Sequence, residues 1–381
     1  MKKIITIIGA RPQIIKAAAL SRAIQKKYAD KLREIIVHTG QHYDDNMSKV
    51  FFDELGIPSA DYNLQAGSGS HGKQTALMLE KIEEILLREK PDAMVVYGDT
   101  NSTLAGAIAA SKIHVPVVHI EAGLRSFNKS MPEEINRIMC DHVSTLLFSP
   151  TKSGFNNLVK EGFNPDARAP FTADNPAIYH CGDVMYDNSL FFSDVAEQKT
   201  NILSMYQLSR GGFILATIHR NNNTDIPERL NSLFGALQQI SSEQSIDIIL
   251  PLHPRTAKLL DTNLNADLLN SIRNNPRFKI CGPVSFLEMI ALERHCKLVM
   301  TDSGGVQKEA FYFKKPCIIL RPETEWVELV ECGAAMVTDA DAGRIHAAFD
   351  HFNKGNQIQY PAFYGDGHAA EFICNEIIKQ L

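Results

Sequence analysis

Short, continuous runs of apolar residues recur along the chain, and each is followed by a loop of glycine and polar residues and then by a helical pattern. The runs of the first half are Ile4–Ile8, Ile35–His38, Ala93–Tyr97, Val117–Ile120 and Leu146–Ser149. Those of the second half are Phe213–Ile218, Ile246–Leu250, Phe278–Cys281, Leu298–Thr301, Cys317–Leu320 and Ala335–Thr338. Because apolar and polar positions do not alternate within them, the runs predict parallel strands buried on both faces.

Helical spacing fills the segments between these runs. Met78, Leu79, Ile82, Ile85 and Leu86, for example, recur at intervals of three and four residues. Strands that alternate with helices predict an α/β fold with parallel sheets. The two series of strands predict two Rossmann-like domains rather than one barrel.

The segment between the two series is irregular and marks the predicted domain boundary. Residues 163–176 contain three prolines and read as a loop, which precedes a short strand and turn at 178–184. We place the boundary near residue 180, which gives an N-terminal domain of residues 1–180 and a C-terminal domain of residues 181–363. Residues 364–381 hold a last helix, from about 369 to 379, and periodicity does not say which domain it joins.

Composition excludes several classes of protein. The chain has 381 residues and a formal net charge of −5, so no global basic field recruits nucleic acid or an anionic membrane. Its seven cysteines are scattered without a C-x-x-C pair, which argues against a disulfide framework. The apolar run after Met1 is too short for a signal peptide, and no stretch approaches the roughly 20 apolar residues of a membrane helix. We therefore expect a soluble, cytoplasmic protein.

Charged residues gather just after the strand predicted at Val117–Ile120. Glu121 is the best single candidate for a site carboxylate, because an acid at the end of a buried strand is costly to desolvate without a partner. Asp99, after the preceding strand, is either a helix cap or a site carboxylate. Glu133 is either a site carboxylate or half of a capping box with Ser130, and Glu134 reads as a helix-surface or capping residue.

Two glycine-containing turns are candidate anion sites. Gly9-Ala-Arg-Pro-Gln-Ile-Ile-Lys16 brings Arg11 and Lys16 to a helix N-terminus, although an ordinary strand-to-helix turn is an equally good interpretation. Thr301-Asp-Ser-Gly-Gly-Val-Gln-Lys-Glu-Ala310 is the strongest motif of the second half. Its two glycines let the backbone approach a phosphate group, and Glu309 is placed to accept hydrogen bonds from a ribose.

Histidine–arginine pairs follow two strands of the second half. His219 with Arg220, and His253 with Arg255, place cations near phosphate groups bound there. Neither pair has metal-ligand spacing to another histidine or cysteine, so no metal is predicted. The run Gly67–Gly72 matches G-x-G-x-x-G, but a short polar segment precedes it, which makes it a poor dinucleotide fingerprint.

Taken together, these motifs resemble the non-hydrolysing UDP-N-acetylglucosamine 2-epimerase family over essentially the whole chain. In order they are GARPQIIK, TGQH, YGDTNST, HIEAGLRS, MPEEINR, GDVMYD, HR, LHPR, GPV, DSGGVQKEA and ETE. The resemblance implies the two-domain architecture of GT-B glycosyltransferases with the substrate in the interdomain cleft. It also implies a last helix that returns to the first domain, a homodimer, a UDP-sugar substrate, and neither NAD nor a metal ion.

The resemblance assigns roles to individual positions. The acid/base carboxylates are Asp99, Glu121 and Glu133, and His219 serves the leaving group. Contacts to the UDP-sugar are implied for Arg11, Lys16, Arg137, His253, Arg255, Ser303, Gly304, Gly305 and Glu309. A regulatory second UDP-sugar would bind at Gln41 and His42. Which carboxylate removes the C2 proton and which returns it stays open.

The chain departs from the better-known branch of the family at several positions. Ala10 and Gln13 replace Thr and Glu, and Asn222 stands where a Glu is usual. These features resemble a branch that includes epimerases of UDP-2,3-diacetamido-2,3-dideoxyglucuronic acid, so this sugar is an alternative to UDP-N-acetylglucosamine. A GT-B glycosyltransferase and a non-catalytic nucleotide-sugar sensor are the remaining alternatives.

Overall fold

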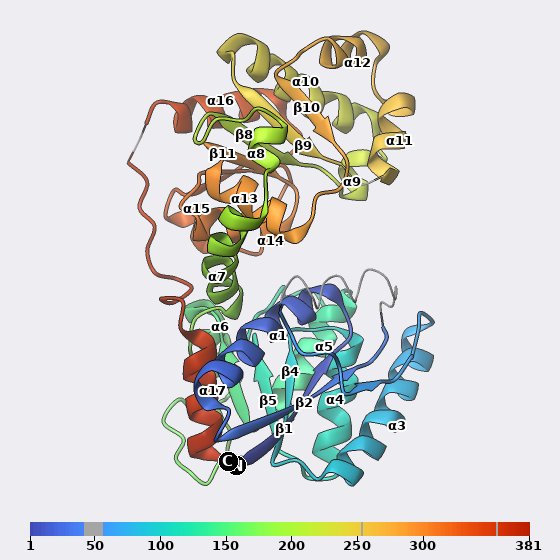
Figure 1. Ribbon diagram of the computed structural model, residues 1–381, viewed down its shortest axis with the longest axis vertical. Coiled ribbons are helices and arrows are strands. Elements are labelled where there is room, and N and C mark those ends of the chain that lie inside the picture. Colours follow the sequence, from blue (N-terminus) through green and yellow to red (C-terminus); the bar gives the residue numbers. More distant parts are fainter. Residues whose placement is uncertain (42–55, 253, 356) are drawn as a thin grey trace. The chain divides into compact units, whose positions relative to one another are not determined.

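The computed structural model describes residues 1–41, 56–252, 254–355 and 357–381, and it divides the chain into two compact units. Unit 1 comprises Met1–Asn188 and Ala362–Leu381, and unit 2 comprises Ser189–Pro361. Figure 1 shows both, with the first residues of the chain in blue and the last in red. The helix α7 (Val184–Lys199) begins in unit 1 and continues into unit 2.

Unit 1 is built on one parallel sheet of seven strands in the order β3-β2-β1-β4-β5-β6-β7. Its strands are β1 (Lys2–Ile8), β2 (Leu32–His38), β3 (Tyr62–Asn63), β4 (Ala93–Tyr97), β5 (Val117–Ile120), β6 (Leu146–Ser149) and β7 (Ala177–His180). Strand order reverses between β1 and β4, and ligands of open α/β sheets bind beyond the carboxyl ends of strands at such a switch point.

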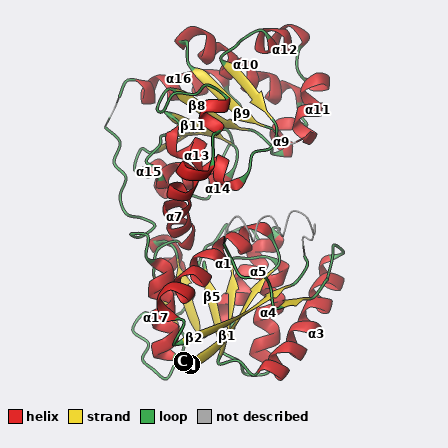
Figure 2. Cartoon of the chain, viewed as in Figure 1, coloured by secondary structure: helices red, strands yellow, loops and turns green. Residues whose placement is uncertain are grey.

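Helices cover both faces of this sheet (Figure 2). They are α1 (Arg11–Ala23), the π-helical turn η1 (Ile24–Tyr28), α3 (His71–Glu89), α4 (Asn101–Lys112), α5 (Pro132–His142), α6 (Lys152–Lys160) and α17 (Ala369–Gln380). On one face, Met78 and Ile82 of α3 and Cys140 of α5 pack with Ile5 and Met94 in a buried core.

The last helix of the chain, α17, belongs to unit 1. Lys27 of η1 forms an ion pair of 2.6 Å with Glu371, and the Tyr28 hydroxyl donates to the Glu371 carbonyl oxygen. Phe372 meets Phe148 of β6 edge to face, with ring centroids 6.3 Å apart. These contacts place α17 in unit 1, whereas the periodicity of the sequence does not say which domain the last helix joins.

Unit 2 repeats the architecture with six parallel strands in the order β10-β9-β8-β11-β12-β13. The strands are β8 (Phe213–Thr217), β9 (Asp247–Pro251), β10 (Phe278–Cys281), β11 (Leu298–Thr301), β12 (Cys317–Ile319) and β13 (Ala335–Val337). The order reverses between β8 and β11, which marks the corresponding switch point of this sheet.

The helices of unit 2 enclose a second core. Besides the end of α7 they are α8 (Ile202–Met205), α9 (Asn221–Thr224), α10 (Pro227–Gln244), α11 (Pro254–Asn263), α12 (Ala266–Arg273), α13 (Phe286–His295), α14 (Gly304–Tyr312), α15 (Val327–Glu331) and α16 (Ala342–Asn353). Leu233 and Phe234 of α10 and Phe349 of α16 pack against Ile248 and Met300 of the sheet. No described helix is long and apolar enough to cross a membrane.

The predicted α/β class with two parallel sheets is confirmed, and every predicted apolar run coincides with a strand to within three residues at each end. The contacts divide the chain inside α7, after Asn188 rather than near residue 180, and again after Pro361. The prolines mark a loop before β7, whereas the first covalent passage between the units lies within the helix α7. Chain composition therefore does not reveal this boundary.

Candidate active site

Glu121 stands at the carboxyl end of β5 in a conformation that few side chains adopt. Its φ is +74°, in the left-handed region that costs a non-glycine residue free energy. Its carboxylate forms an ion pair with Lys16 of α1, and both side chains are only 13% exposed. Such strain persists when surrounding contacts enforce it, and it concentrates at functional sites.

Asp99, at the carboxyl end of β4, is not the cap of α4. The cap of α4 is Thr100, whose hydroxyl accepts from the Thr103 N–H. Asp99 instead forms an ion pair with Arg137 of α5, which also pairs with Glu134. Burial alone would lower the pKa of Arg137, but Asp99, Glu134 and Glu121 raise it above its ordinary value.

The start of α5 differs from the capping box that the sequence suggests. The residue before the helix is Met131, and the Ser130 N–H donates to the Asn128 side chain at 3.1 Å rather than to Glu133. Glu133 lies exposed in the first turn. The capping interpretation of Glu133 is therefore wrong, and its carboxylate is left to solvent or a ligand.

Glu134 is buried, so its interpretation as a surface or capping residue is also wrong. It is 1% exposed and accepts from the N–H groups of Ser126 and Phe127, each at 2.9 Å. Burial would raise its pKa, but these two N–H groups and Arg137 lower the pKa below its ordinary value. Glu134 thus holds the loop that joins β5 to α5 and helps to place Arg137.

The turn after β1 is closed by Gln13. Its side-chain oxygen accepts from the N–H groups of Gly9 and Ala10, and its amide nitrogen donates to the Tyr97 carbonyl oxygen at 3.0 Å. All these groups are buried, so Gln13 ties the turn after β1 to the end of β4. Arg11, on the same turn, is exposed.

An amide network also reaches Asp99, and sequence reasoning missed it. The Asn136 side chain of α5 donates to the Asp99 carbonyl oxygen at 2.9 Å. Asn101 lies between Asn136 and His71, with its Nδ2 3.1 Å from the His71 ring. The only signal was His71 itself, within the glycine-rich run. Gln41 accepts from the Ser102 N–H and hydroxyl, whereas His42 lies outside the described residues.

In unit 2, His219 is anchored by Asp302 across the switch point. Its Nδ1 lies 3.0 Å from Asp302 Oδ1, and Asp302 also accepts from the backbone N–H groups of His219 and Arg220. The Asp302 side chain is fully buried, whereas that of His219 is 51% exposed. Burial would raise the pKa of Asp302, but its contacts with His219, Arg220 and Asn223 lower it. Because Nδ1 of His219 contacts the Asp302 carboxylate, Nε2 lies on the solvent-exposed side of the ring.

The glycine motif after β11 forms the start of α14. Ser303 caps this helix, and the first-turn N–H groups of Gly304 and Gly305 have no partner within it. A Cβ at Gly304 would lie 2.3 Å from a Glu325 carboxylate oxygen, so a side chain there would displace the Glu325 carboxylate. Trp326 donates its ring N–H to the Gly304 carbonyl oxygen at 2.9 Å. The described geometry suits an anion at the helix N-terminus.

Arg255 lies close to this edge of the sheet but already has an acidic partner. Its Nη2 contacts both carboxylate oxygens of Asp225, at 2.6 and 2.7 Å, and Nη1 donates to Asn221. Both members of the pair are exposed, so the pair is weak and can open for a ligand. His253 lies outside the described residues.

Glu309 has a buried acidic neighbour, which leads to a prediction about stability. Glu293 of α13 is fully buried, and burial together with Glu309 raises its pKa well above the ordinary value. Because the pKa of Glu293 is higher in the folded state than in the unfolded state, stability falls as pH rises above the unfolded pKa of about 4.3.

We therefore expect Glu293→Gln to raise the thermal midpoint of unit 2 at pH 7–8, by several degrees. The gain should vanish near pH 4, where both states carry the proton. Thermal unfolding followed by circular dichroism at the two pH values measures it. Glu243→Gln, at an exposed position of α10, is the matched control and should leave both midpoints unchanged. An equal gain at both pH values would contradict the explanation.

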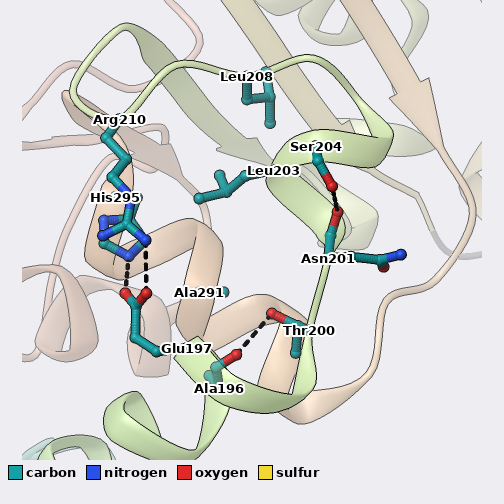
Figure 3. Close-up of a pocket in the computed structure, with 10 residues that line it drawn as sticks. All are labelled: Ala196, Glu197, Thr200, Asn201, Leu203, Ser204, Leu208, Arg210, Ala291 and His295. Atoms are coloured by element: carbon teal, nitrogen blue, oxygen red, sulfur yellow. Dashed lines mark hydrogen bonds and ion pairs between the residues drawn. The ribbon is translucent and has the colours of Figure 1, made fainter.

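A partly open cavity of about 310 Å³ lies elsewhere in unit 2 (Figure 3). Its charged residues neutralise one another, since Glu197 pairs with both Arg210 and His295. The His295 carbonyl oxygen accepts from Gly211, just before β8 begins, so the cavity lies at the amino ends of the strands. It is therefore separate from the candidate site. No described group of three or more potential metal ligands is close enough to hold an ion.

The comparison with known proteins agrees with the geometry. The family model for UDP-N-acetylglucosamine 2-epimerase matches residues 23–378. The chain belongs to the UDP-N-acetylglucosamine 2-epimerase family. Its members act as isomerases, and the predicted resemblance is confirmed.

Individual relatives are similar over the full length. The chain is 49% identical to the UDP-2,3-diacetamido-2,3-dideoxy-D-glucuronate 2-epimerase of Pseudomonas aeruginosa, over 99% of each chain. It is 47% identical to a UDP-N-acetylglucosamine 2-epimerase homolog of Methanococcus maripaludis, over 100% of each.

Solved structures share the architecture. The structure of UDP-GlcNAc 2-epimerase from Methanocaldococcus jannaschii matches with a TM-score of 0.85, 38% identity and 99% coverage of both chains. A glycosyltransferase from Rickettsia africae matches with a TM-score of 0.56 at 15% identity, over 100% of this chain and 96% of that chain, which shows the fold alone. The two parallel-sheet units are thus GT-B-like.

Proposed function

We propose that this protein inverts the configuration at C2 of a UDP-linked 2-acetamido sugar by eliminating UDP and adding it back. One observation carries the proposal. Asp99 and Glu121, on neighbouring strand ends of unit 1, each form an ion pair with a cation, and a second set of anion-binding groups follows β8 and β11. A protein that only bound the nucleotide would have no need of the paired carboxylates.

The chemistry explains why carboxylates and anion-binding groups are both required. The C2 proton is not adjacent to a carbonyl group, so its direct removal would be very slow. As the C1–O bond breaks, UDP leaves with the electron pair and C1 gains oxocarbenium character, which acidifies C2–H. A carboxylate takes that proton, C1=C2 forms, and the intermediate is a 2-acetamidoglucal. UDP then adds to C1 while C2 receives a proton on the opposite face.

We assign the proton transfers at C2 to Asp99, Glu121 and Glu133. Arg137 and Lys16 pair with the first two and orient them, while Glu133 lies exposed on the first turn of α5. Two faces of the sugar need two groups. The assignment of removal and return among the three carboxylates is left to experiment.

We assign binding and stabilisation of UDP to unit 2, with Arg11 as a further contact from unit 1. His219 donates through Nε2 to the departing diphosphate, and the N–H groups of Gly304 and Gly305 supply the helix N-terminus. Ser303 caps that helix and Glu309 accepts from the ribose. His253 and Arg255 remain predicted contacts to UDP, and Gln41 and His42 remain predicted positions for a regulatory UDP-sugar. The homodimer also remains a prediction.

UDP-N-acetylglucosamine is the first candidate substrate, because the family model and several full-length relatives carry that name. UDP-2,3-diacetamido-2,3-dideoxyglucuronic acid is the second, favoured by the relative that is 49% identical. Both sugars have the 2-acetamido group and the C2 proton that the mechanism uses. The choice between them concerns the substituents at C3 and C5.

The test is incubation with each sugar alone in deuterated buffer, followed by NMR. We expect deuterium at C2 and the C2 epimer of one of the two sugars, with UDP still attached to the product. A glycosyltransferase or a sensor would leave both sugars unlabelled, and a hydrolysing epimerase would release free UDP and sugar. Either result would refute the proposal.

A further inference from the structure

A buried histidine lies beneath both strand ends that carry the candidate carboxylates. His119 is in β5 and is 0% exposed, on the face of the sheet that α5 covers. A polar ring in the middle of an apolar strand is costly unless both nitrogens are hydrogen-bonded. His119 lies two residues before Glu121 on the same strand, so its hydrogen-bond partners bear on the placement of the Glu121 carboxylate.

Both ring nitrogens of His119 have partners. Nε2 lies 2.8 Å from the Gly98 carbonyl oxygen, which can only accept, so Nε2 carries a proton. Nδ1 lies 2.7 Å from Asp141 Oδ1. Burial would raise the pKa of Asp141, but its contacts with His119 and Arg125 lower it below its ordinary value. Through its two ring nitrogens, His119 therefore joins Asp141 of α5 to the end of β4.

Asp141 extends this connection to the loop after β5. Its Oδ2 accepts from the Gly123 N–H at 3.1 Å and from Arg125 Nη2 at 2.7 Å. Arg125 in turn holds Glu161 through two hydrogen bonds of 2.7 Å each. The fully buried Asp141 carboxylate thus holds two turns. It holds Gly98, the residue before Asp99, through His119, and it holds Gly123 directly.

The two turns held in this way are conformationally demanding and lie against each other. Gly98 has a φ of +62° and Gly123 a φ of +78°. Gly98 lies against the Glu121 side chain, and Gly123 follows Glu121 by two residues. A Cβ at Gly98 would lie 3.0 Å from Glu121 Oε2 and 3.2 Å from Lys16 Nζ. A rotation of the Gly98 peptide therefore displaces Asp99 directly. It also changes the contact between Gly98 and the Glu121 carboxylate.

We propose that His119 is a positioning residue whose hydrogen bond to the Gly98 carbonyl oxygen sets the separation of the Asp99 and Glu121 carboxylates. This inference rests on the proposed C2 inversion. His119 does not reach the substrate; it acts through the Gly98–Asp99 peptide. An error of about 1 Å in the placement of a catalytic group can cost on the order of 100-fold in rate.

Two substitutions separate the two hydrogen bonds of the ring. In His119→Gln the side-chain amide nitrogen takes the place of Nε2 and can still donate to Gly98. In His119→Asn the amide nitrogen takes the place of Nδ1, so the contact with Asp141 is kept and that with Gly98 is lost. A purely structural role in the core predicts similar losses in both variants.

We expect His119→Gln to keep kcat within about threefold of the wild type and His119→Asn to lower kcat by about 10- to 100-fold. The KM for the sugar and the affinity for UDP, measured by titration calorimetry, should change by less than about twofold in both, because unit 2 is untouched. Glu161→Gln, at the far end of the Arg125 contact, is the control and should leave kcat unchanged. Equal kcat values for the Gln and Asn variants in folded protein would overturn the proposal.

Two further measurements keep the proposal testable. If His119→Asn does not fold, His119→Gln alone still tests the proposal, because it keeps a donor to the Gly98 carbonyl oxygen; a kcat drop of more than about tenfold in this folded variant would overturn the proposal. Crystal structures of the two His119 variants should show the Asp99 carboxylate displaced in the Asn variant alone. This structural readout also decides the matter if the wild type inverts neither sugar, an outcome that refutes the proposed function separately.

Discussion

Replacing Glu121 with glutamine should lower the rate of C2 deuterium exchange by about 10²- to 10⁴-fold, while UDP still binds with nearly unchanged affinity. A glutamine keeps the size of the side chain and a hydrogen bond to Lys16, but it cannot accept the C2 proton, and general acid–base catalysis contributes this order of magnitude. NMR of the exchange reaction and calorimetry with UDP measure the two quantities. A loss of C2 exchange without a loss of UDP affinity would assign Glu121 to proton transfer rather than to UDP binding.

The matched control is Glu89→Gln. Glu89 also contacts a lysine, Lys3, and its side chain is 19% exposed, similar to Glu121 at 13%. It ends α3, next to the amino end of β4, where no role in catalysis is expected. Its variant should exchange C2 deuterium at the wild-type rate. Exchange by Glu121→Gln at a rate within about threefold of wild type would remove this residue from the proton-transfer step.

Replacing His219 with asparagine should lower kcat by about 10²- to 10³-fold, because the departing diphosphate loses a charge-assisted hydrogen bond as its negative charge develops. Asp302→Asn should produce part of the same loss, since the carboxylate orients Nδ1 and leaves Nε2 for the ligand. Steady-state kinetics of C2 inversion measures both effects. The double variant should be little worse than His219→Asn, because both changes affect one interaction.

His295→Asn is the control for His219, since His295 also pairs with a carboxylate, that of Glu197 (Figure 3). His295 lies near the amino end of β8, whereas His219 follows its carboxyl end. Its variant should keep kcat. Asp302→Asn also has a pH signature. The pKa of Asp302 is lowered in the folded state, so its stabilising contribution is present above the unfolded pKa of about 3.9 and is lost as pH falls through the folded value. The stability difference from wild type should be large at pH 7 and disappear at strongly acidic pH.

The sequence was sufficient for most of the strands and for the turns that hold most of the proposed site residues. A parallel strand buried on both faces must be apolar along its whole length, so the eleven runs were visible without any tertiary information. Turns at the carboxyl ends of such strands carry ligand-binding groups, which directed attention to Glu121, Asp99 and the Ser303–Gly305 turn. Local chemistry of this kind is encoded within a few residues.

Interpretations that depended on a partner far along the chain were less successful. Glu134 looked like a surface residue, yet it accepts hydrogen bonds from the loop at Ser126 and Phe127. Asp141 and His119 drew no attention, because one lies within a helical pattern and the other within an apolar run. Their meaning depends on burial and on each other, and neither property is visible in a linear pattern.

The sequence by itself therefore determined the two parallel sheets, the family, and the turns that hold the proposed site residues, because apolar run length and turn composition are local properties. Only the tertiary structure decided that Lys16 pairs with Glu121, that Arg137 pairs with Asp99, and that His119 and Asp141 join the two turns. These interactions connect residues up to 105 positions apart, and the ion pairs form only where folding brings the groups together and excludes water. The strand ends supply the proposed catalytic groups, and long-range packing sets their geometry.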